Sequence, residues 1–237
     1  MITPDDMLTA GGASATESNP AAGPGRETVR GTVHQVSAIL LDVDGTLVDT
    51  YELYLESYRR ALEPYLGYIP SIEEFVARQP SSERQFLADW LGSMEEAIAC
   101  RAEMARHYEA LHDALCGGMY EGVREMLQAL RSAGIPLGVV TGKGRRAWEI
   151  TARSTGLGEF DVVITDDDTE RPKPHPEGLT AAALALGAVP ENVVYIGDSI
   201  ADLEAGRAAG MRIGTALWPK ATPEDRESFL RAIRRWE

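Results

Sequence analysis

The sequence predicts an α/β fold: a doubly wound, Rossmann-like parallel sheet with an inserted all-helical cap. Two observations lead to this prediction. Short, continuous apolar runs alternate with helical patterns over most of the chain, as buried strands and crossover helices do in a parallel sheet. Residues 50–118 interrupt the alternation with helical patterns at 51–66, 82–91 and 94–115 and contain no strand-like run. That segment is too long for a simple crossover, so we interpret it as a separate helical unit.

Four apolar runs predict the central strands of the sheet. The first is SAILLDV (37–43), and runs of the same type are IPLGVVT (135–141), DVVIT (161–165) and NVVYIGD (192–198). Helical patterns precede or follow them, such as VREMLQALRSAG (123–134) and LTAAALALGA (179–188). MRIGTAL (211–217) is expected to add a last strand, and residues 223–236 a closing helix.

The domain boundaries follow from these elements. The core is expected to comprise residues 36–48 and 119–237, and the helical cap residues 49–118. Residues 1–35 are rich in small residues and proline; because such a segment buries too little apolar surface to offset its ordering entropy, we expect a disordered tail.

Composition narrows the class of function. The 237-residue chain carries a net charge of −14, which disfavours nucleic acid or an anionic membrane surface as partner, because phosphates would be repelled. No signal peptide or membrane-spanning stretch is expected. The chain has two cysteines, too few for a disulfide framework, so we expect a reducing, cytoplasmic location.

Polar residues follow each of the four predicted central strands. They are Asp42 and Asp44 after the first strand, Thr141 and Gly142 after the second, Lys173 after the third, and Asp198 after the fourth, with Asp202 one turn later. Taken singly, each could be a helix cap or a solvated charge. The carboxyl ends of parallel strands meet at one edge of a sheet, however, so we expect these side chains to share one cleft.

The residue types indicate phosphoryl chemistry. Three carboxylates (Asp42, Asp44 and Asp198) sharing a cleft require a divalent cation, and oxygen ligands suit Mg²⁺ better than zinc. Lys173, Thr141 and the backbone N–H groups near Gly142 are groups that bind phosphoryl oxygens. One aspartate could then attack phosphorus and form an aspartyl-phosphate, while the other acts as acid and base.

A zinc site is the alternative that the cysteines raise. Cys100, His107, His112 and Cys116 occur in an order that resembles a zinc ligand set. If residues 95–115 form one helix, Cys100 and His107 share a face from which the other two point away. We therefore reject this interpretation.

The motifs resemble those of the haloacid dehalogenase-like phosphohydrolases, specifically the phosphoglycolate-phosphatase-like group with a helical cap. They stand as DVDGTLVDT (42–50), VVTGK (139–143), RPKPHPEG (171–178) and GDSIADLEAG (197–206). The resemblance covers about residues 36–215. It implies that Asp42 is the nucleophile, that Asp44 is the general acid and base, and that Mg²⁺ is held by Asp42, the Asp44 backbone carbonyl and Asp198.

The same resemblance implies roles for the remaining core residues. Thr141 and Lys173 should hold the phosphoryl oxygens, and Asp202 should orient a metal-bound water or Lys173 from outside the ligand set. The dehalogenase branch lacks the second acidic residue of the first motif. Because Asp44 is present, phosphorus rather than carbon chemistry is favoured.

The cap is expected to select the substrate. The stretch ARQPSSERQ (77–85) resembles a loop that enters the cleft, where Arg78 and Arg84 would bind a carboxylate or second phosphate, unless both are solvated surface arginines. Residues 50–118 contain no lysine, which counts against the phosphonoacetaldehyde-hydrolase branch, whose chemistry needs a cap lysine.

Three functions remain open on sequence alone. The favoured one is a Mg²⁺-dependent phosphatase of a small, phosphoglycolate-like monoester. The second is a pyrophosphatase or a β-phosphoglucomutase-type mutase on the same scaffold. The third, a non-catalytic binding protein, is disfavoured because the acidic motifs and Lys173 are intact. We expect a small phosphorylated metabolite as partner, with the protein a monomer or homodimer.

Overall fold

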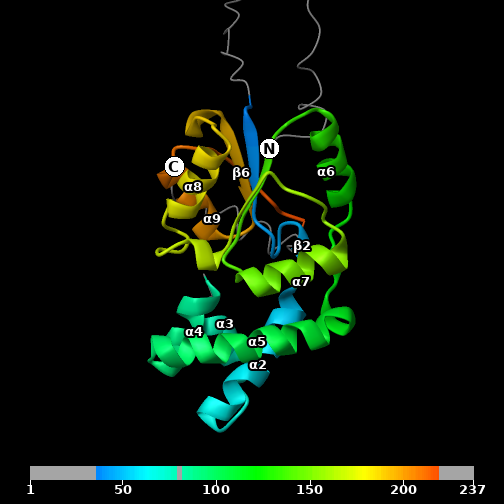
Figure 1. Ribbon diagram of the computed structural model, residues 1–237. Helices are drawn as coiled ribbons and strands as arrows, with labels where there is room; N and C mark the ends of the chain where they lie inside the picture. Colours follow the sequence, from blue (N-terminus) through cyan, green and yellow to red (C-terminus); the bar gives the residue numbers. More distant parts are fainter. Residues whose placement is uncertain (1–35, 79–81, 219–237) are drawn as a thin grey trace, which may run out of the picture. The chain divides into compact units, whose positions relative to one another are not determined.

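The computed structural model describes residues 36–78 and 82–218 (Figure 1). The predicted N-terminal tail and the predicted closing helix lie outside these residues. Within the described part of the chain, no helix is long and apolar enough to cross a membrane.

A five-stranded parallel sheet forms the centre of the core, as predicted. Its strands are β1 (Ala38–Leu41), β4 (Leu137–Val140), β5 (Val162–Ile164), β6 (Val193–Gly197) and β7 (Arg212–Thr215). They lie in the order β5-β4-β1-β6-β7, so β1 is central. Every residue of β1, β4 and β6 is buried. The continuous apolar runs thus reflect strands enclosed on both faces.

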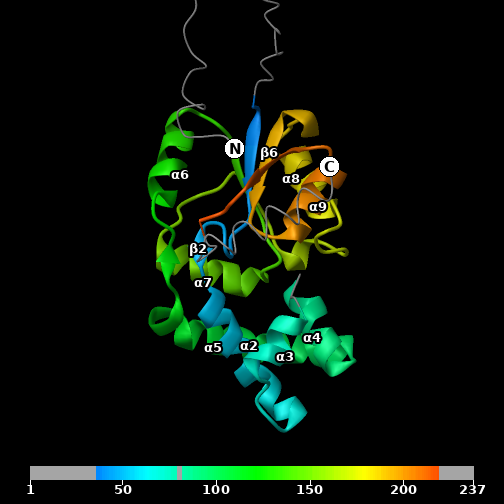
Figure 2. The same cartoon turned by 180° about the vertical axis from the view of Figure 1, so that it is seen from behind.

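Helices cover both faces of the sheet (Figures 1 and 2). The covering helices are α6 (Val123–Ser132), α7 (Arg145–Thr155), α8 (Glu177–Ala185) and α9 (Ile200–Ala208), with 3₁₀ turns at Asp166–Asp168 and Pro190–Asn192. Leu127 of α6 and Trp148 of α7 share a hydrophobic cluster with Ile39 of β1. Leu179 of α8 packs in a second cluster with the next residue of β1, Leu40. The two clusters therefore lie on opposite faces, because side chains alternate along a strand.

Four helices follow the first strand among the described residues of the segment predicted to be the cap. They are α2 (Tyr51–Leu66), α3 (Ile72–Ala77), α4 (Glu83–Leu91) and α5 (Met94–Leu115). They bury their own aromatic cluster, in which the ring centroids of Phe75 and Phe86 are 4.7 Å apart and those of Tyr58 and Phe86 are 5.0 Å apart. Ala147 and Ile150 of α7 complete this cluster, so the helical segment packs against the core through α7.

Two very short strands join this helical segment to the core. β2 (Val48–Asp49) and β3 (Gly118–Met119) pair antiparallel, with Val48 opposite Met119 and Asp49 opposite Gly118. The chain therefore leaves the core and returns to it at one place. The sequence analysis placed the domain boundaries here but predicted no strand, because two-residue strands leave no periodic pattern.

Candidate active site

A cavity of about 1050 Å³ lies at the carboxyl edge of the sheet. Its lining includes six of the predicted core residues: Asp42, Asp44, Thr141, Gly142, Lys173 and Asp198. The helical segment also contributes lining residues, among them Tyr54, Tyr58, Phe75 and Glu83. The structure thus brings the strand-end residues together, with helices α2 to α4 on the other side of the cavity.

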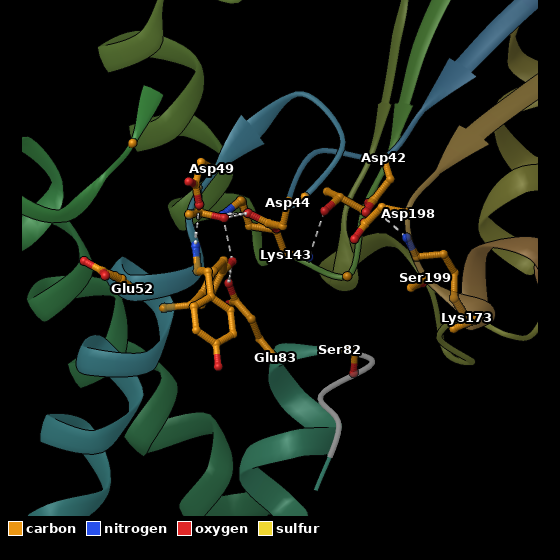
Figure 3. A pocket seen from close by; sticks show the side chains of 18 of the residues that line it. Asp42, Asp44, Asp49, Glu52, Ser82, Glu83, Lys143, Lys173, Asp198 and Ser199 are labelled. Carbon is orange, nitrogen blue, oxygen red and sulfur yellow. Dashed lines mark hydrogen bonds and ion pairs between the residues drawn. The ribbon is translucent and has the colours of Figure 1, made fainter. Parts of the chain in front are cut away.

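Lys173 lies beside Asp42 (Figure 3) and forms ion pairs with both Asp42 and Asp202. Its Nζ donates to Asp42 Oδ1 at 2.9 Å, to Asp202 Oδ1 at 2.6 Å and to Tyr195 Oη at 3.1 Å. Tyr195 in turn donates to Asp202 Oδ1 at 2.6 Å, and Ser199 Oγ donates to Asp202 Oδ2 at 2.6 Å. Asp202 is therefore tied to the core and holds the ammonium group of Lys173 beside Asp42.

The charges in this group shift one another's pKa values. Burial alone would lower the pKa of Lys173, but Asp202 and Asp42 outweigh it and raise that pKa well above its ordinary value. Burial raises the pKa of the Asp42 carboxyl; Lys173 opposes this, and the neighbouring carboxylates of Asp202, Asp44 and Asp198 add to it. Asp42 therefore lies in an excess of negative charge that one lysine does not neutralise.

The acidic residues fit a divalent cation. Asp42, Asp198 and Asp202 each offer a carboxylate oxygen, and these atoms lie within 4.8 Å of one another. Gly45 lies against the Asp198 carboxylate, where a Cβ would be 2.5 Å from Oδ2. Thr46 Oγ1 donates to Asp198 Oδ1 at 3.4 Å. This set of oxygen donors around Asp42 and Asp198 has the chemistry that Mg²⁺ prefers.

Asp44 has a separate cation, which the sequence analysis did not identify. The Nζ of Lys143 lies 2.9 Å from Asp44 Oδ1, and Thr50 Oγ1 also donates to that oxygen. Lys143 follows Thr141 by two residues, inside the VVTGK motif. The only sequence signal was a lysine close to a strand end, which is also common in solvated loops.

Thr141 and Gly142 lie at the end of β4. Thr141 is buried and its Oγ1 accepts a hydrogen bond from the Lys143 backbone N–H at 3.2 Å. The carbonyl of Gly142 accepts a hydrogen bond from the backbone N–H of Glu83 at 3.1 Å. The loop after β4 therefore contacts both the cavity and the N-terminus of α4.

The two predicted cap arginines are not among the residues that line this cavity. Arg78 is exposed, and its guanidinium lies 3.7 Å from the ring centroid of Trp90. Arg84 is directed to the core instead: it donates to the Thr169 carbonyl at 2.9 Å and lies 3.7 Å from Asp166 Oδ1. The structure does not bring either arginine together with Asp42.

A comparison with protein families agrees with this arrangement. The family model for haloacid dehalogenase-like hydrolases matches residues 39–216. This span includes every candidate catalytic and metal-binding residue described above. The chain belongs to the haloacid dehalogenase-like hydrolase family. It is therefore an enzyme of a hydrolase family, and its predicted fold class is confirmed by solved members.

Relatives of this family member carry more specific names. Pyrophosphatase PpaX of Bacillus velezensis is 37% identical over 193 residues, which cover 79% of this chain and 86% of PpaX. CbbY of Rhodobacter sphaeroides, solved with phosphate, is 25% identical with a TM-score of 0.70, covering 76% of this chain and 86% of CbbY. A candidate phosphoglycolate phosphatase of Lactobacillus plantarum is 27% identical with a TM-score of 0.69, covering 81% and 91% of the two chains.

Proposed function

We propose that this family member is a Mg²⁺-dependent phosphatase that hydrolyses a small phosphate monoester, phosphoglycolate-like in size, through an aspartyl-phosphate on Asp42. The observation that carries the proposal is the contact of Lys173 Nζ with Asp42 Oδ1 at 2.9 Å, at the carboxyl edge of the sheet. Asp198 beside it and Thr141, which also lines the cavity, support the same chemistry.

The first step forms a bond between a carboxylate oxygen of Asp42 and phosphorus, and breaks the bond between phosphorus and the leaving oxygen. Asp44 donates a proton to that oxygen. Lys173 and Thr141 hold the phosphoryl oxygens, and Asp202 keeps Lys173 in place. When bound by Asp42, the Asp44 carbonyl and Asp198, Mg²⁺ would neutralise charge on the phosphoryl group.

The second step hydrolyses the aspartyl-phosphate. Asp44, now a carboxylate, takes a proton from a water molecule whose oxygen attacks phosphorus. The bond between Asp42 and phosphorus breaks, inorganic phosphate leaves, and both aspartates regain their starting states. The proton given to the leaving group is thus recovered from water.

The test is an acid quench of Asp42→Asn, Asp44→Asn and the unchanged protein during turnover of an aryl phosphate, followed by mass spectrometry of the peptide containing residues 36–59. Asp42→Asn should show no phosphorylated peptide. Asp44→Asn should turn over about 10²–10⁴-fold more slowly while still phosphorylating Asp42, because an aryl leaving group needs little protonation. A phosphate carried by Asp44 in the Asp42→Asn protein would refute the assignment.

A second candidate is a pyrophosphatase, which the name of the Bacillus relatives favours. The two functions share the steps above and differ only in the leaving group. Phosphate release from monoesters and from pyrophosphate, each with and without Mg²⁺, separates them. If kcat/KM for pyrophosphate exceeds that for every monoester tested, the pyrophosphatase is the correct choice.

We further propose a cytoplasmic location, with a small phosphorylated metabolite as substrate and no nucleic acid or membrane partner. Cys100 and Cys116 are free thiols in the described chain, which is consistent with a reducing compartment.

A further inference from the structure

Lys143 is a fully buried lysine between the core and the helical segment. Its Nζ lies 2.8 Å from Tyr54 Oη, 2.9 Å from Tyr108 Oη and 2.9 Å from Asp44 Oδ1. An ammonium group has three N–H donors, and these three oxygens account for all of them. The rings of Tyr54 and Tyr108 also lie near the charge, with centroids 4.0 Å and 4.6 Å from Nζ.

Burying this charge requires compensation. Desolvation alone would lower the pKa of Lys143, but Asp44 and Tyr108 outweigh it and raise the pKa above its ordinary value. Lys143 is therefore charged in the folded protein. An apolar residue would fill the same space without a desolvation cost, so filling space does not explain a lysine here.

The two tyrosines connect Lys143 to the helical segment. Tyr54 belongs to α2, and its hydroxyl donates to Glu83 Oε1 of α4 at 2.7 Å. Glu83 is buried and accepts a hydrogen bond from Arg101 of α5 at 3.2 Å. Tyr108 belongs to α5 and is hydrogen-bonded to Thr151 of α7 at 2.8 Å. The position of the ammonium group therefore depends on how α2 and α5 lie on the core.

The contacts of Asp44 distinguish its two carboxylate oxygens. Among the described residues, Lys143 and Thr50 both contact Oδ1 of the carboxylate. Oδ2 is then the oxygen available to exchange a proton with a leaving group or a water. A proton donor must lie within about 2.6–3.2 Å of the atom it protonates, so fixing the rotation of this carboxylate matters for the reaction.

We propose that Lys143 is the positioning residue for the Asp44 carboxylate. Tyr54 and Tyr108 make the position of the Lys143 ammonium group depend on how the helical segment packs on the core. The carboxylate is aligned for proton transfer when α2 and α5 hold the ammonium group in place. This inference rests on the proposed function, in which Asp44 is the general acid and base.

Another role for the same lysine is direct binding of a second anionic group on the substrate, because Lys143 is one of the residues lining the cavity. Such a group would have to displace Asp44 or a tyrosine hydroxyl, since all three N–H donors are in use. We therefore favour positioning, and the two roles predict different kinetics.

The test compares leaving groups. Lys143→Met keeps the length of the side chain and removes its charge. With Mg²⁺, kcat of this variant for glycerol phosphate should fall about 10²-fold, the scale of a misplaced catalytic group. With p-nitrophenyl phosphate, whose leaving group needs little protonation, the fall should be less than tenfold. KM should change little for either ester.

Four further variants make the test specific. In an Asp44→Asn background, Lys143→Met should cause no further loss with glycerol phosphate, because the group it positions is gone. Tyr54→Phe and Tyr108→Phe keep their rings and should shift the ratio of the two esters in the same direction, by less. Tyr65→Phe, an exposed tyrosine of α2 outside the cavity lining, should leave the ratio unchanged.

Each outcome decides between the roles. Equal losses with both esters, or a further loss in the Asp44→Asn background, would overturn the positioning role. A rise in KM confined to pyrophosphate or phosphoglycolate would instead assign Lys143 to the binding of a second anionic group. If Lys143→Met fails to fold, the two tyrosine variants decide, and an unchanged ratio in both overturns the proposal. Absence of Mg²⁺-dependent phosphate release by the unchanged protein would refute the proposed function itself, independently of any ratio.

Discussion

Replacing Gly45 by alanine tests the close approach between the first motif and Asp198. Gly45 has a φ of +73°, and an added Cβ would lie 2.5 Å from Asp198 Oδ2 and 2.8 Å from Oδ1. No pair of such atoms tolerates these distances, so the carboxylate must turn away. Gly67 provides a matched control, because its φ is +75° and an added Cβ meets no atom within 4 Å.

Both variants place a Cβ on a left-handed backbone, but only the Cβ of Gly45→Ala would clash with Asp198. A left-handed conformation costs a residue with a Cβ about 1–2 kcal/mol. Replacing glycine also reduces the conformational entropy of the unfolded chain, which stabilises the folded state by about 0.4–1 kcal/mol. Gly67→Ala should therefore destabilise by at most about 1.6 kcal/mol, a fall in Tm of no more than about 6 °C at this size. Gly45→Ala should lose this amount and, in addition, the stabilisation that Mg²⁺ gives by binding at Asp198.

The assay is thermal unfolding with and without Mg²⁺. At a hundredfold excess over its Kd, a ligand stabilises by about 2.7 kcal/mol, so Mg²⁺ should raise the Tm of the unchanged protein and of Gly67→Ala by roughly 5–11 °C. In Gly45→Ala this rise should be small or absent. A full Mg²⁺ response in Gly45→Ala would show that Asp198 is not a metal ligand or that the loop gives way instead.

Two further expectations concern buried charges and thiols. Lys173→Met leaves Asp42 and Asp202 without their cation, so the metal-free protein should lose about 3–5 kcal/mol of unfolding free energy, measured by urea titration. Adding Asp202→Asn should recover part of this loss. The absence of any recovery would contradict the pairing of Lys173 with Asp202. Burial raises the pKa of Cys100 to about 12, so a thiol reagent at pH 8 should modify at most Cys116 in the folded protein and both cysteines in urea. Rapid modification of two thiols in the folded protein would contradict the burial of Cys100.

The sheet was predictable because enclosed strands leave continuous apolar runs. Each of the five runs contains an observed strand, and the helical patterns at 51–66, 82–91 and 94–115 correspond to α2, α4 and α5. The six-residue helix α3 lies in a segment predicted as helical but was not identified by itself. It is shorter than two turns, so it presents too few residues for a helical period to be recognised.

The candidate site was predictable only where topology alone determines position. Asp42 and Asp198 follow adjacent strands, so a sequence argument brings them to one edge. Lys143 instead depends on Tyr54, 89 residues earlier in the chain, and on Tyr108, 35 residues earlier. Such contacts depend on how the helical segment packs, and no local pattern records that packing. The same holds for Arg84, whose partners on the core lie more than 80 residues away.

The paired strands β2 and β3 have an evolutionary consequence. Because Asp49 and Gly118 lie opposite each other, the ends of the intervening helical segment meet where the chain leaves the sheet. A segment whose ends meet can be lengthened, shortened or exchanged as a unit while the flanking strands keep their register, as inserted domains are. The residues around Asp42, Lys173 and Asp198 belong to the part that stays. New substrate preferences could thus arise in this lineage by replacing one module, without rebuilding the groups that handle phosphorus.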